Sequence, residues 1–410
     1  MNNEKALMIP PQVRYVIDRL EAAGHHAYCV GGCVRDHLMG REPLDYDVTT
    51  SALPEEMLAV FAGDRVVETG LKHGTLTIVK DGMNIETTTY RIDGTYDDGR
   101  HPDEVTYTDK LTDDLYRRDF TINAMAYSPV YGIVDLFHGR QDLVSRVIRC
   151  VGEAKERFSE DGLRILRALR FAAVLDFELD DECAAGVRSE MPLLSKISRE
   201  RIYAELTKLL DGRAAGRVLG EYPDVIAYIL PALDEAAVRA AAGTIDESHT
   251  AAPTDGAMRY ALLFQSLDDG DAEKMLASLK PSKAFAKQTL SLLRTRAEAI
   301  PETEADLLRQ MNRYGDDFPM RAALYARLCG RITEEKAAEN TRTAEALIRA
   351  DRCRRLSDLA LTGGDLMAAG LHGTDIGAAL GRALDGVMDG KVPNERAALI
   401  GYLSSEKGDS

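Results

Sequence analysis

The sequence VGGCVRDHLMGREPLDYDV, residues 30–48, decides how the rest of the chain is interpreted. Apolar residues 27–30 predict a buried strand, and Gly31 and Gly32 follow it as a tight turn. Residues 33–39 then predict a short helix, so the glycines lie between a strand and a helix N-terminus. In that position backbone N–H groups approach a phosphate, and the helix adds positive potential. A turn without a ligand is the alternative that two glycines alone leave open.

Two aspartates, Asp45 and Asp47, lie in residues 44–49, which predict a second strand. Alternate residues of a strand point to the same face, so these two carboxylates aim at one point. Two aligned carboxylates, together with triphosphate oxygens, are a common way to hold Mg²⁺. With the glycine turn and Arg35 close in sequence, the spacing predicts nucleotide chemistry.

A third carboxylate is predicted from Glu86, which lies in the β-branched strand of residues 84–90. Alone, such an acid usually faces solvent. If its strand neighbours that of Asp45, Glu86 completes a site for two metal ions. Two cations would lower the pKa of an attacking hydroxyl and neutralise charge on the phosphoryl group and its pyrophosphate leaving group.

The run RRDFTINA, residues 117–124, sets two cations, an acid and an amide in an otherwise apolar stretch. Two interpretations remain open. Either Asp119 caps the start of a helix, or Arg118 contacts phosphate while Asp119 accepts a hydrogen bond from a ribose hydroxyl.

Residues 160–175 predict one strong helix in which Asp161, Arg164, Arg167 and Arg170 recur every three residues. That spacing keeps them near one face over three turns. Apolar residues fill the rest of the helix, which leaves little exposed surface for a solvated charge stripe. Because Asp161 accepts and Arg164 donates hydrogen bonds, the two together match the Watson–Crick edge of a base.

Composition points to a soluble, reduced, cytoplasmic protein. The 410 residues contain no apolar run of membrane-spanning length, no secretion signal, and six cysteines without metal or disulfide spacing, so packing is expected for Cys29 and Cys33. The net charge of −16 argues against a nucleic-acid partner. Two locally basic stretches offer an RNA path nonetheless: Lys280, Lys283, Lys287, Arg294 and Arg296, and Arg352, Arg354 and Arg355.

Secondary-structure signals change along the chain. Up to about residue 139 they alternate between helix and strand, with a polar segment at 91–109 expected to be a mobile loop and a last strand at 133–137. Beyond residue 141 helical spacing dominates. The predicted fold class is α+β: a mixed-sheet head followed by an all-helical remainder.

Six motifs in order, VGGCVRD, DYDVTT, TGLKHGT, RRDFTINA, DLFHGRQDL and EDGLRILRALRFAA, resemble the class II tRNA nucleotidyltransferases. This family contains CCA-adding enzymes and bacterial poly(A) polymerases. Residues 198–205 and 361–387 resemble two further segments of it. The resemblance covers most of the chain, most densely residues 25–210.

The resemblance implies four parts: a nucleotidyltransferase head (1–139), a neck that selects the nucleobase (140–211), a helical body (212–300) and a helical tail that binds tRNA (301–410). It implies Mg²⁺ on Asp45 and Asp47, with Glu86 as the third catalytic carboxylate. Asp161 and Arg164 would select CTP or ATP, supported by Arg167 and Arg170. The implied nucleotide-binding residues are Gly31, Gly32, Arg35, Arg118, Asp119, Asp161, Arg164, Arg167 and Arg170.

The implied activity is addition of C, C and A to tRNA 3′ ends from CTP and ATP. TGLKHGT and a full-length 91–109 segment favour a CCA-adding enzyme over a poly(A) or CC-adding enzyme. An A-adding enzyme stays open, and so does a tRNA-binding protein without catalysis. An antibiotic-modifying nucleotidyltransferase would not need the helical extension. The oligomeric state is undetermined.

Some family members carry a metal-dependent phosphohydrolase domain. In this chain Ser248, His249 and Thr250 resemble its first histidine segment, but residues 262–265, LLFQ, replace the expected His-Asp pair. We therefore predict no such metal site.

Overall fold

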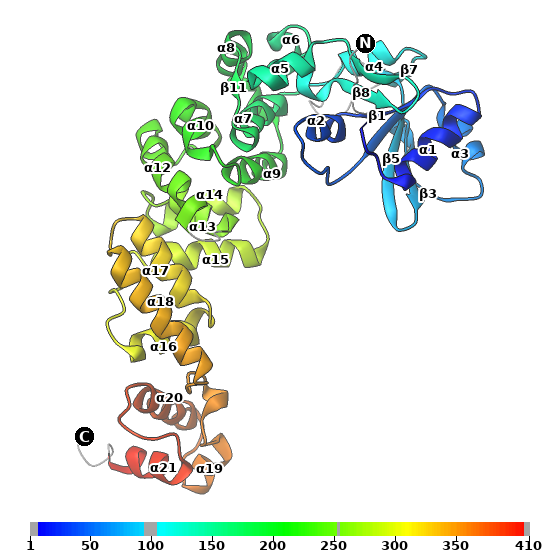
Figure 1. Ribbon diagram of the computed structural model, residues 1–410. Helices are drawn as coiled ribbons and strands as arrows, with labels where there is room; N and C mark the ends of the chain where they lie inside the picture. The colour runs from blue at the N-terminus through cyan, green and yellow to red at the C-terminus, as the bar shows by residue number, and fades with distance from the viewer. Residues whose placement is uncertain (1–6, 94–104, 252–254, 406–410) are drawn as a thin grey trace. The chain divides into compact units, whose positions relative to one another are not determined.

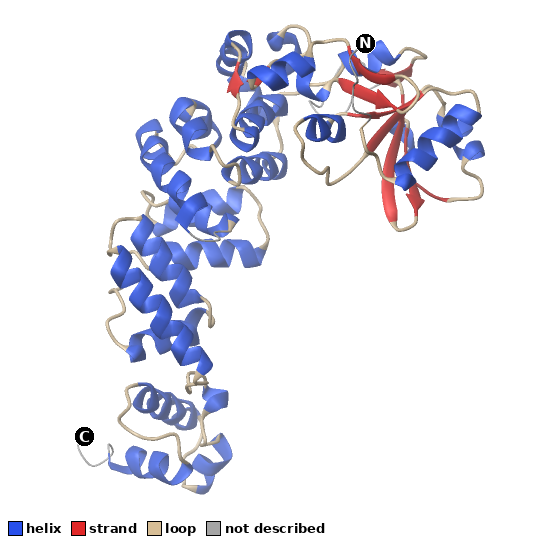
Figure 2. Ribbon diagram, in the orientation of Figure 1, coloured by secondary structure: helices blue, strands red, loops and turns tan. Residues whose placement is uncertain are grey.

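The computed structural model describes residues 7–93, 105–251 and 255–405 (Figure 1). The chain divides into two compact units, Met1–Arg239 and Ala240–Ser410. All strands of the described residues lie in the first unit, and the second is helical (Figure 2). The expected α+β class is therefore confirmed, whereas the finer division into four parts stays a prediction.

A seven-stranded mixed sheet organises the start of the first unit, in the order β3-β4-β5-β2-β1-β8-β9. Only β2 and β5 pair in parallel; the other neighbours are antiparallel. The strands are β1 (Ala27–Val30), β2 (Asp47–Thr50), β3 (Arg65–Gly70), β4 (Thr75–Lys80), β5 (Met83–Thr89), β8 (Met125–Ser128) and β9 (Gly132–Asp135).

Helices α1 (Pro11–Ala22) and α3 (Pro54–Val60) pack on one face of this sheet (Figure 1). Buried residues of α1 recur at spacings of three and four, which places them on one helix face. They are Val13, Val16, Ile17 and Leu20. These side chains join apolar residues of β1, β2, β4 and β5 in a single core, and the buried Cys29 and Cys33 belong to it, as the packing interpretation predicted.

Several predicted strand bounds are wrong. The strand expected at 44–49 begins only at Asp47, so Asp45 lies in the preceding loop. The strand expected at 133–137 is β9, which ends at Asp135. Strand β8 was not predicted, because its four residues are all buried and show no alternation of apolar and polar side chains.

The segment expected to be a loop at 91–109 is structured at both ends. Strands β6 (Arg91–Asp93) and β7 (Val105–Tyr107) form a two-stranded antiparallel ribbon, and residues 94–104 lie outside the described residues. Gly74 allows β7 to pack closely, because a Cβ atom there would lie 2.7 Å from the Tyr107 ring. Helix α4 (Leu111–Tyr116) follows the ribbon.

The helix expected over 160–175 is two helices. Helix α6 (Ala154–Glu160) ends before Asp161, which is extended, and α7 (Leu163–Leu175) starts after Gly162. Gly162 lets Leu193 pack closely beside this break, because a Cβ atom at Gly162 would lie 2.9 Å from Leu193 Cβ. Asp161 therefore does not share a helix face with the arginines of α7, and that prediction is wrong.

Short helices complete the first unit, together with the two-stranded parallel pair β10 (Val147–Ile148) and β11 (Glu178–Leu179). The family-like segment that starts at Ser198 forms a helix, with Ser198 at its N-cap position. The remaining elements are α2 (Gly32–Leu38), η1 (Leu71–His73), η2 (Thr121–Asn123), α5 (Gly139–Ser145), α8 (Asp181–Ser189), η3 (Met191–Lys196), α9 (Arg199–Leu210), α10 (Ala215–Glu221) and α11 (Pro223–Ile229).

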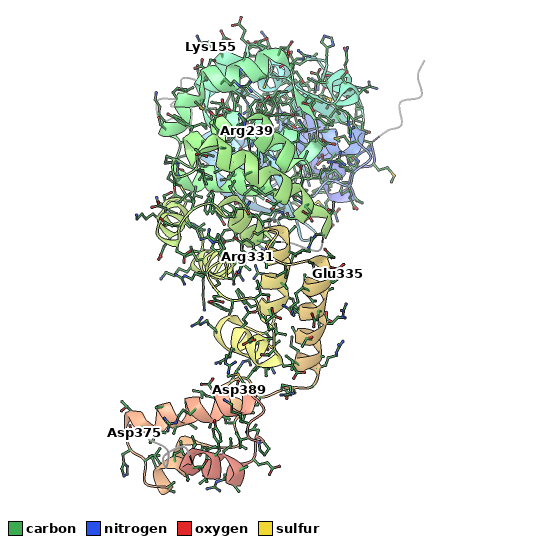
Figure 3. The ribbon with its side chains drawn as sticks, turned by 90° about the vertical axis from the view of Figure 1, so that its left-hand side faces the viewer. Lys155, Arg239, Arg331, Glu335, Asp375 and Asp389 are labelled. Atoms are coloured by element: carbon green, nitrogen blue, oxygen red, sulfur yellow. The ribbon has the colours of Figure 1, made fainter. Side chains whose placement is uncertain are left out.

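The second unit is a series of helices. It comprises most of α12 (Glu235–Ala251), α13 (Gly256–Leu263), α14 (Asp269–Ser278), α15 (Lys283–Arg294), α16 (Glu304–Tyr314), α17 (Phe318–Leu328), α18 (Glu334–Arg349), η4 (Leu356–Asp358), α19 (Gly363–Ala368), α20 (Thr374–Met388) and α21 (Arg396–Ser405). Its last part has its own core, made by α16 and α18–α21. Asp389, at the end of α20, pairs with Arg309 of α16 (Figure 3). Among the described residues, no helix is long and apolar enough to cross a membrane.

Gly139 offers a test of how α5 packs on η2. A Cβ atom at Gly139 would lie 2.3 Å from the carbonyl oxygen of Thr121, and backbone atoms do not yield readily. We expect Gly139→Ala to lower the free energy of unfolding by about 1–3 kcal/mol. Urea unfolding measures this change. Gly220→Ala in α10 is the control, because open space surrounds Gly220, and it should raise stability by about 0.5–1 kcal/mol. Equal effects of the two substitutions would contradict the packing argument.

Candidate active site

Three carboxylates meet at the centre of the sheet. In the parallel pair of β2 and β5, Asp47 lies opposite Glu86, and Asp45 precedes Asp47 by two residues. All three side chains are exposed, whereas Tyr46 between the aspartates is buried in the core. The sheet register therefore brings together the acids that the sequence predicted, although the two strands are about 40 residues apart in sequence.

The three negative charges affect the protonation of Asp47. Reduced hydration of its carboxylate by the surrounding protein raises the pKa of Asp47 to about 6, and the charges of Glu86 and Asp45 act in the same direction against Arg118. A bound cation would relieve this repulsion, so the donor set fits a divalent metal ion. Among the described residues, no group of three His, Cys, Asp or Glu side chains forms a ready metal cage.

The glycine turn lies beside these acids, because Val30 pairs with Asp47 across β1 and β2. Gly31 adopts a φ of +79°, and its N–H donates to the Met125 carbonyl at 3.2 Å. The Gly31 amide is therefore already used in the sheet. A Cβ atom at Gly31 would lie 3.1 Å from Arg118 Nη1, so glycine also lets this guanidinium approach the turn.

Asp114 anchors Arg118, and the sequence analysis did not identify it. The Asp114 side chain is fully buried and accepts hydrogen bonds from Thr49, Arg117 and Arg118 at 2.8–3.2 Å. Burial acts to raise the pKa of Asp114, but the two guanidinium groups outweigh burial and lower it. The spacing of Asp114 to Arg117 and Arg118, three and four residues, was the available signal. Arg118 Nε is buried without a hydrogen-bond partner in the described part of the chain, a donor that an anionic ligand would satisfy.

Arg35 extends from α2 towards the same region. Its Nη1 donates to Asn123 Oδ1 at 2.7 Å, and its Nε pairs with Asp36 at 2.9 Å. Asn123 in turn donates to Asp119 at 3.1 Å. Asn123 thus links two predicted site residues, a role that only the fold reveals, because 88 residues separate it from Arg35.

The side chain of Asp119 accepts hydrogen bonds from protein groups, and it neither caps a helix nor is free for a ribose hydroxyl. Its Oδ1 accepts from the Phe120 amide at 2.8 Å and from Asn123, and its Oδ2 accepts from Arg167 Nε at 2.8 Å and from Arg167 Nη2. A carboxylate accepts about four hydrogen bonds, so its capacity is filled. Arg167 and these hydrogen bonds hold the pKa of Asp119 well below its ordinary value, although burial opposes them. The helix-cap interpretation is wrong, since Phe120 is the N-cap of η2, and a ribose contact would require Arg167 to move.

The structure does not pair Asp161 with Arg164. Asp161 accepts from Arg201 Nη2 of α9 at 2.7 Å. Arg164 is buried and donates to the backbone carbonyls of Arg157 and Arg117, each at 3.0 Å, and it forms an ion pair with Glu160. Both side chains would have to exchange partners to read a base together.

The two remaining arginines of the predicted site contact one aromatic ring. Arg167 and Arg170 lie over Phe171, with guanidinium carbons 5.6 and 3.7 Å from the ring centroid. Arg170 Nε also lies 2.7 Å from Glu205 Oε2 of α9. The sequence analysis treated Phe171 only as an apolar neighbour.

The basic stretches of the second unit differ in their exposure. Arg296 donates to the carbonyls of Gln265 and Leu267 and pairs with Asp269, so it is structural. In the second stretch every arginine has an acidic partner: Arg352 pairs with Glu304, and Arg354 and Arg355 both pair with Asp316. On α15, by contrast, Lys283, Lys287 and Arg294 are exposed, and none has an acidic partner among the described residues.

Two aligned carboxylates beside a glycine turn and unsatisfied arginine donors define a nucleotidyltransferase site. Comparison with known proteins agrees. A family model of the poly(A) polymerase head domain matches residues 27–149, and a model of tRNA nucleotidyltransferase domain 2 matches residues 253–403. Between them, residues 176–236 match a model described as a probable RNA- and SrmB-binding site of polymerase A.

Relatives that match this chain over nearly its full length show which kind of nucleotidyltransferase it resembles. The CCA-adding enzyme of Levilactobacillus brevis is 38% identical over 395 residues, which cover 95% of this chain and 96% of the relative. The CCA-adding enzyme of Bacillus stearothermophilus, solved in complex with CTP, has a TM-score of 0.82 at 29% identity and covers 98% of this chain and 99% of its own. The tRNA-bound Thermotoga maritima enzyme, at 21% identity and a TM-score of 0.66, covers 97% of this chain and 96% of its own and shows the fold alone. The chain belongs to the family of CCA-adding enzymes, the tRNA nucleotidyltransferases that the motifs resembled.

The raised pKa of Asp47 predicts how stability depends on pH. An acid whose pKa is higher in the folded state holds its proton there between about pH 4 and 6, so wild-type stability falls as pH rises through this window. Without divalent cations, Asp47→Asn should therefore raise Tm at pH 8 by about 1–3 °C, a small change because solvent screens the charges. At pH 4.5 the same substitution should raise Tm by less.

Differential scanning fluorimetry with a chelator at the two pH values measures this difference. Asp109→Asn is the control, because Asp109 is an exposed acid outside the carboxylate group. The same Tm change for Asp47→Asn at both pH values would refute the electrostatic explanation.

Proposed function

We propose that this chain completes tRNA 3′ ends by adding C, C and A from CTP and ATP. The observation that carries the proposal is the register of Asp47 with Glu86 beside the Gly31 turn, in a chain that belongs to the CCA-adding family. In each addition the terminal 3′-oxygen forms a bond to the α-phosphorus and loses its proton. The bond from that phosphorus to the bridging oxygen breaks, and pyrophosphate leaves.

Asp45 and Asp47 are the residues that would hold Mg²⁺, with Glu86 as the neighbouring third carboxylate. When bound, the metal ions lower the pKa of the attacking hydroxyl and neutralise charge on the phosphoryl group. The raised pKa of Asp47 supports this assignment, because the three acids repel one another until a cation is present.

Gly32, Arg35 and Arg118 would bind the triphosphate, and Gly31 would shape the turn around it. Arg118 is the strongest of these candidates, because its buried Nε lacks a partner in the described part of the chain. Asp114 holds the same guanidinium from the other side at 3.2 Å. The side chain is therefore fixed before substrate arrives, which reduces the entropy lost on binding.

Base and ribose recognition would fall to Asp119, Asp161 and the arginines of α7. In the structure their hydrogen-bonding groups are used internally, Asp161 by Arg201 and Asp119 by Arg167. Their role therefore includes an exchange of partners when nucleotide binds. The proposal also includes the four-part division at residues 139, 211 and 300, and a cytoplasmic location.

The decisive experiment is product sequencing. Purified protein, Mg²⁺, CTP and ATP are incubated with three tRNA transcripts: one lacking CCA, one ending in C, and one ending in CC. Extension of all three to CCA and no further is expected. Extension of the CC-ended transcript alone would identify an A-adding enzyme. Extension that halts at CC would identify a CC-adding enzyme, and long A tails would identify a poly(A) polymerase.

Substitution of the metal-binding acids tests the assigned site. Asp45→Asn with Asp47→Asn should lower kcat by at least about 10³-fold, because Mg²⁺ would lose both carboxylates. Affinity for tRNA, measured by filter binding, should change by less than about threefold. Asp109→Asn is again the control for activity. Full activity of the double variant would show that Asp45 and Asp47 take no part in the mechanism. A wild-type protein that binds tRNA but adds no nucleotide would instead support the alternative of a tRNA-binding protein without catalysis.

The exposed basic face of α15 supports tRNA as the partner of an acidic protein. Lys283, Lys287 and Arg294 lie within about 40° of one another around the helix axis, at 100° per residue. Thr289, Leu292 and Leu293 are buried and face the protein. Three exposed cations on one face, without acidic partners among the described residues, offer an RNA phosphate backbone a local positive surface despite the net charge of −16.

Salt dependence tests this face. Lys283→Gln, Lys287→Gln and Arg294→Gln together should weaken tRNA binding and reduce the slope of log K against log[salt] by about 2 to 3, close to 0.9 per lost phosphate contact. Fluorescence anisotropy over a KCl series measures the slope.

The control variant changes net charge equally, from −16 to −19, at three cations that already have acidic partners. These are Arg14, Arg239 and Lys274, each changed to Gln. Identical slopes for the two triple variants would show that only net charge matters and would exclude the α15 face as a tRNA contact.

A further inference from the structure

One buried ring joins arginines that come from two parts of the first unit. Phe171 of α7 is buried and packs edge-to-face against Phe120, with ring centroids 5.7 Å apart. The guanidinium carbon of Arg170 lies 3.7 Å from the Phe171 centroid, that of Arg35 lies 5.2 Å away, and that of Arg167 lies 5.6 Å away. Few rings attract three cations, since a significant cation–π contact occurs about once per 70–80 residues.

The three guanidinium groups have different second partners. Arg35, from α2, donates to Asn123 at 2.7 Å. Arg167 donates to Asp119 at 2.8 Å, and Arg170 lies beside Glu205. The Phe171 ring is therefore the only group in these contacts that all three arginines share.

Like charges held this close repel one another. Burial lowers the pKa of Arg170 below its ordinary value, and the charges of Arg167 and Arg35 act in the same direction, while Glu205 opposes them. The negative face of an aromatic ring attracts cations without adding a charge of its own. Phe171 thus gathers the arginines while leaving them available to an anion.

The ring also helps to hold Arg170. Arg170 Nε and Glu205 Oε2 are 2.7 Å apart, yet both atoms are buried without an aligned hydrogen bond among the described residues. An ion pair without that alignment fixes distance rather than the plane of the guanidinium. The Phe171 ring, with its centroid 3.7 Å from the guanidinium carbon, holds Arg170 through a cation–π contact as well.

We propose that Phe171 is a positioning residue that couples phosphate binding by Arg35 to Arg167 and Arg170, the arginines that support base selection by Asp161 and Arg164. A triphosphate that draws Arg35 would alter its contact with the ring, and the ring would transmit this change to α7. The inference rests on the proposed function, because it takes these three arginines as nucleotide-binding residues. It adds a residue that touches no substrate and acts through its neighbours.

The test compares two replacements of the ring. Phe171→Leu and Phe171→Met keep an apolar side chain of similar volume and remove the π face, and Phe171→Tyr keeps the ring. Phe177→Leu is the matched control, because Phe177 is a buried phenylalanine of the same unit, and no described cation lies over its ring. For each variant the measurements are KM for CTP and ATP, misincorporation of UTP, tRNA affinity and Tm.

We expect Phe171→Leu and Phe171→Met to raise KM for both nucleotides about tenfold and UTP misincorporation by a similar factor, with tRNA affinity unchanged. The Phe171→Tyr variant, which keeps the ring, should have KM values within about twofold of wild type. Phe177→Leu should lower Tm about as much as Phe171→Leu without changing KM or misincorporation.

Two results would overturn the proposal. One is a Phe171→Leu or Phe171→Met enzyme with lowered Tm but wild-type KM and fidelity, which would show a purely structural ring. The other is an equal KM rise in Phe177→Leu, which would show that any buried ring has this effect. Failure of wild-type protein to add nucleotides would instead refute the proposed function, so the two failures are distinguishable.

Discussion

The parallel pairing of β2 with β5 is the constraint on which the rest of the site depends. It sets Asp47 directly opposite Glu86, and the antiparallel pairing of β2 with β1 sets the Gly31 turn beside both. Reduced hydration of the Asp47 carboxylate, together with the nearby charges of Glu86 and Asp45, raises the pKa of Asp47, and this costs folding free energy above pH 6. Backbone hydrogen bonds and the apolar core under α1 and α3 hold the register in spite of that cost. Such local electrostatic strain is typical of sites that are completed by a cation or substrate.

Around this centre, buried arginines are each matched to specific acceptors. Arg117 and Arg118 are held by Asp114, Arg167 by Asp119, and Arg164 by Glu160 and two carbonyls. Buried guanidinium groups need such partners, since an unpaired buried charge is strongly unfavourable. The consequence is a site in which most recognition groups already have partners before substrate binds, while Arg118 Nε has none among the described residues. Selection of a nucleotide then becomes a competition between internal partners and the incoming base, ribose and phosphates.

The distribution of ion pairs explains how a chain of negative net charge can present a positive surface to an RNA substrate. In the second unit most arginines of the basic stretches are neutralised by aspartate or glutamate, or bind backbone carbonyls. The exception is α15, where three exposed cations share one face. A negative average field limits non-specific attraction of polyanions, and the α15 face is the local positive surface that we propose for the tRNA backbone.

The sequence by itself determined the fold class, most helices, the glycine turn and the three carboxylates, because these depend on local periodicity and on motifs within a few residues. It did not determine the break at Asp161, where the backbone is extended and Leu193 packs against the following Gly162. Nor did it identify the partners of Asp119, Asp161 and Arg164, or the roles of Asn123, Asp114 and Phe171. Some of these contacts are local, such as Asp114 with Arg117 and Arg118, Glu160 with Arg164, and Asp119 with Asn123. The decisive ones join distant residues: Arg201 to Asp161, Arg167 to Asp119, and Arg35 to Asn123 and Phe171. Sheet order and helix packing decide which of these distant groups come within contact distance.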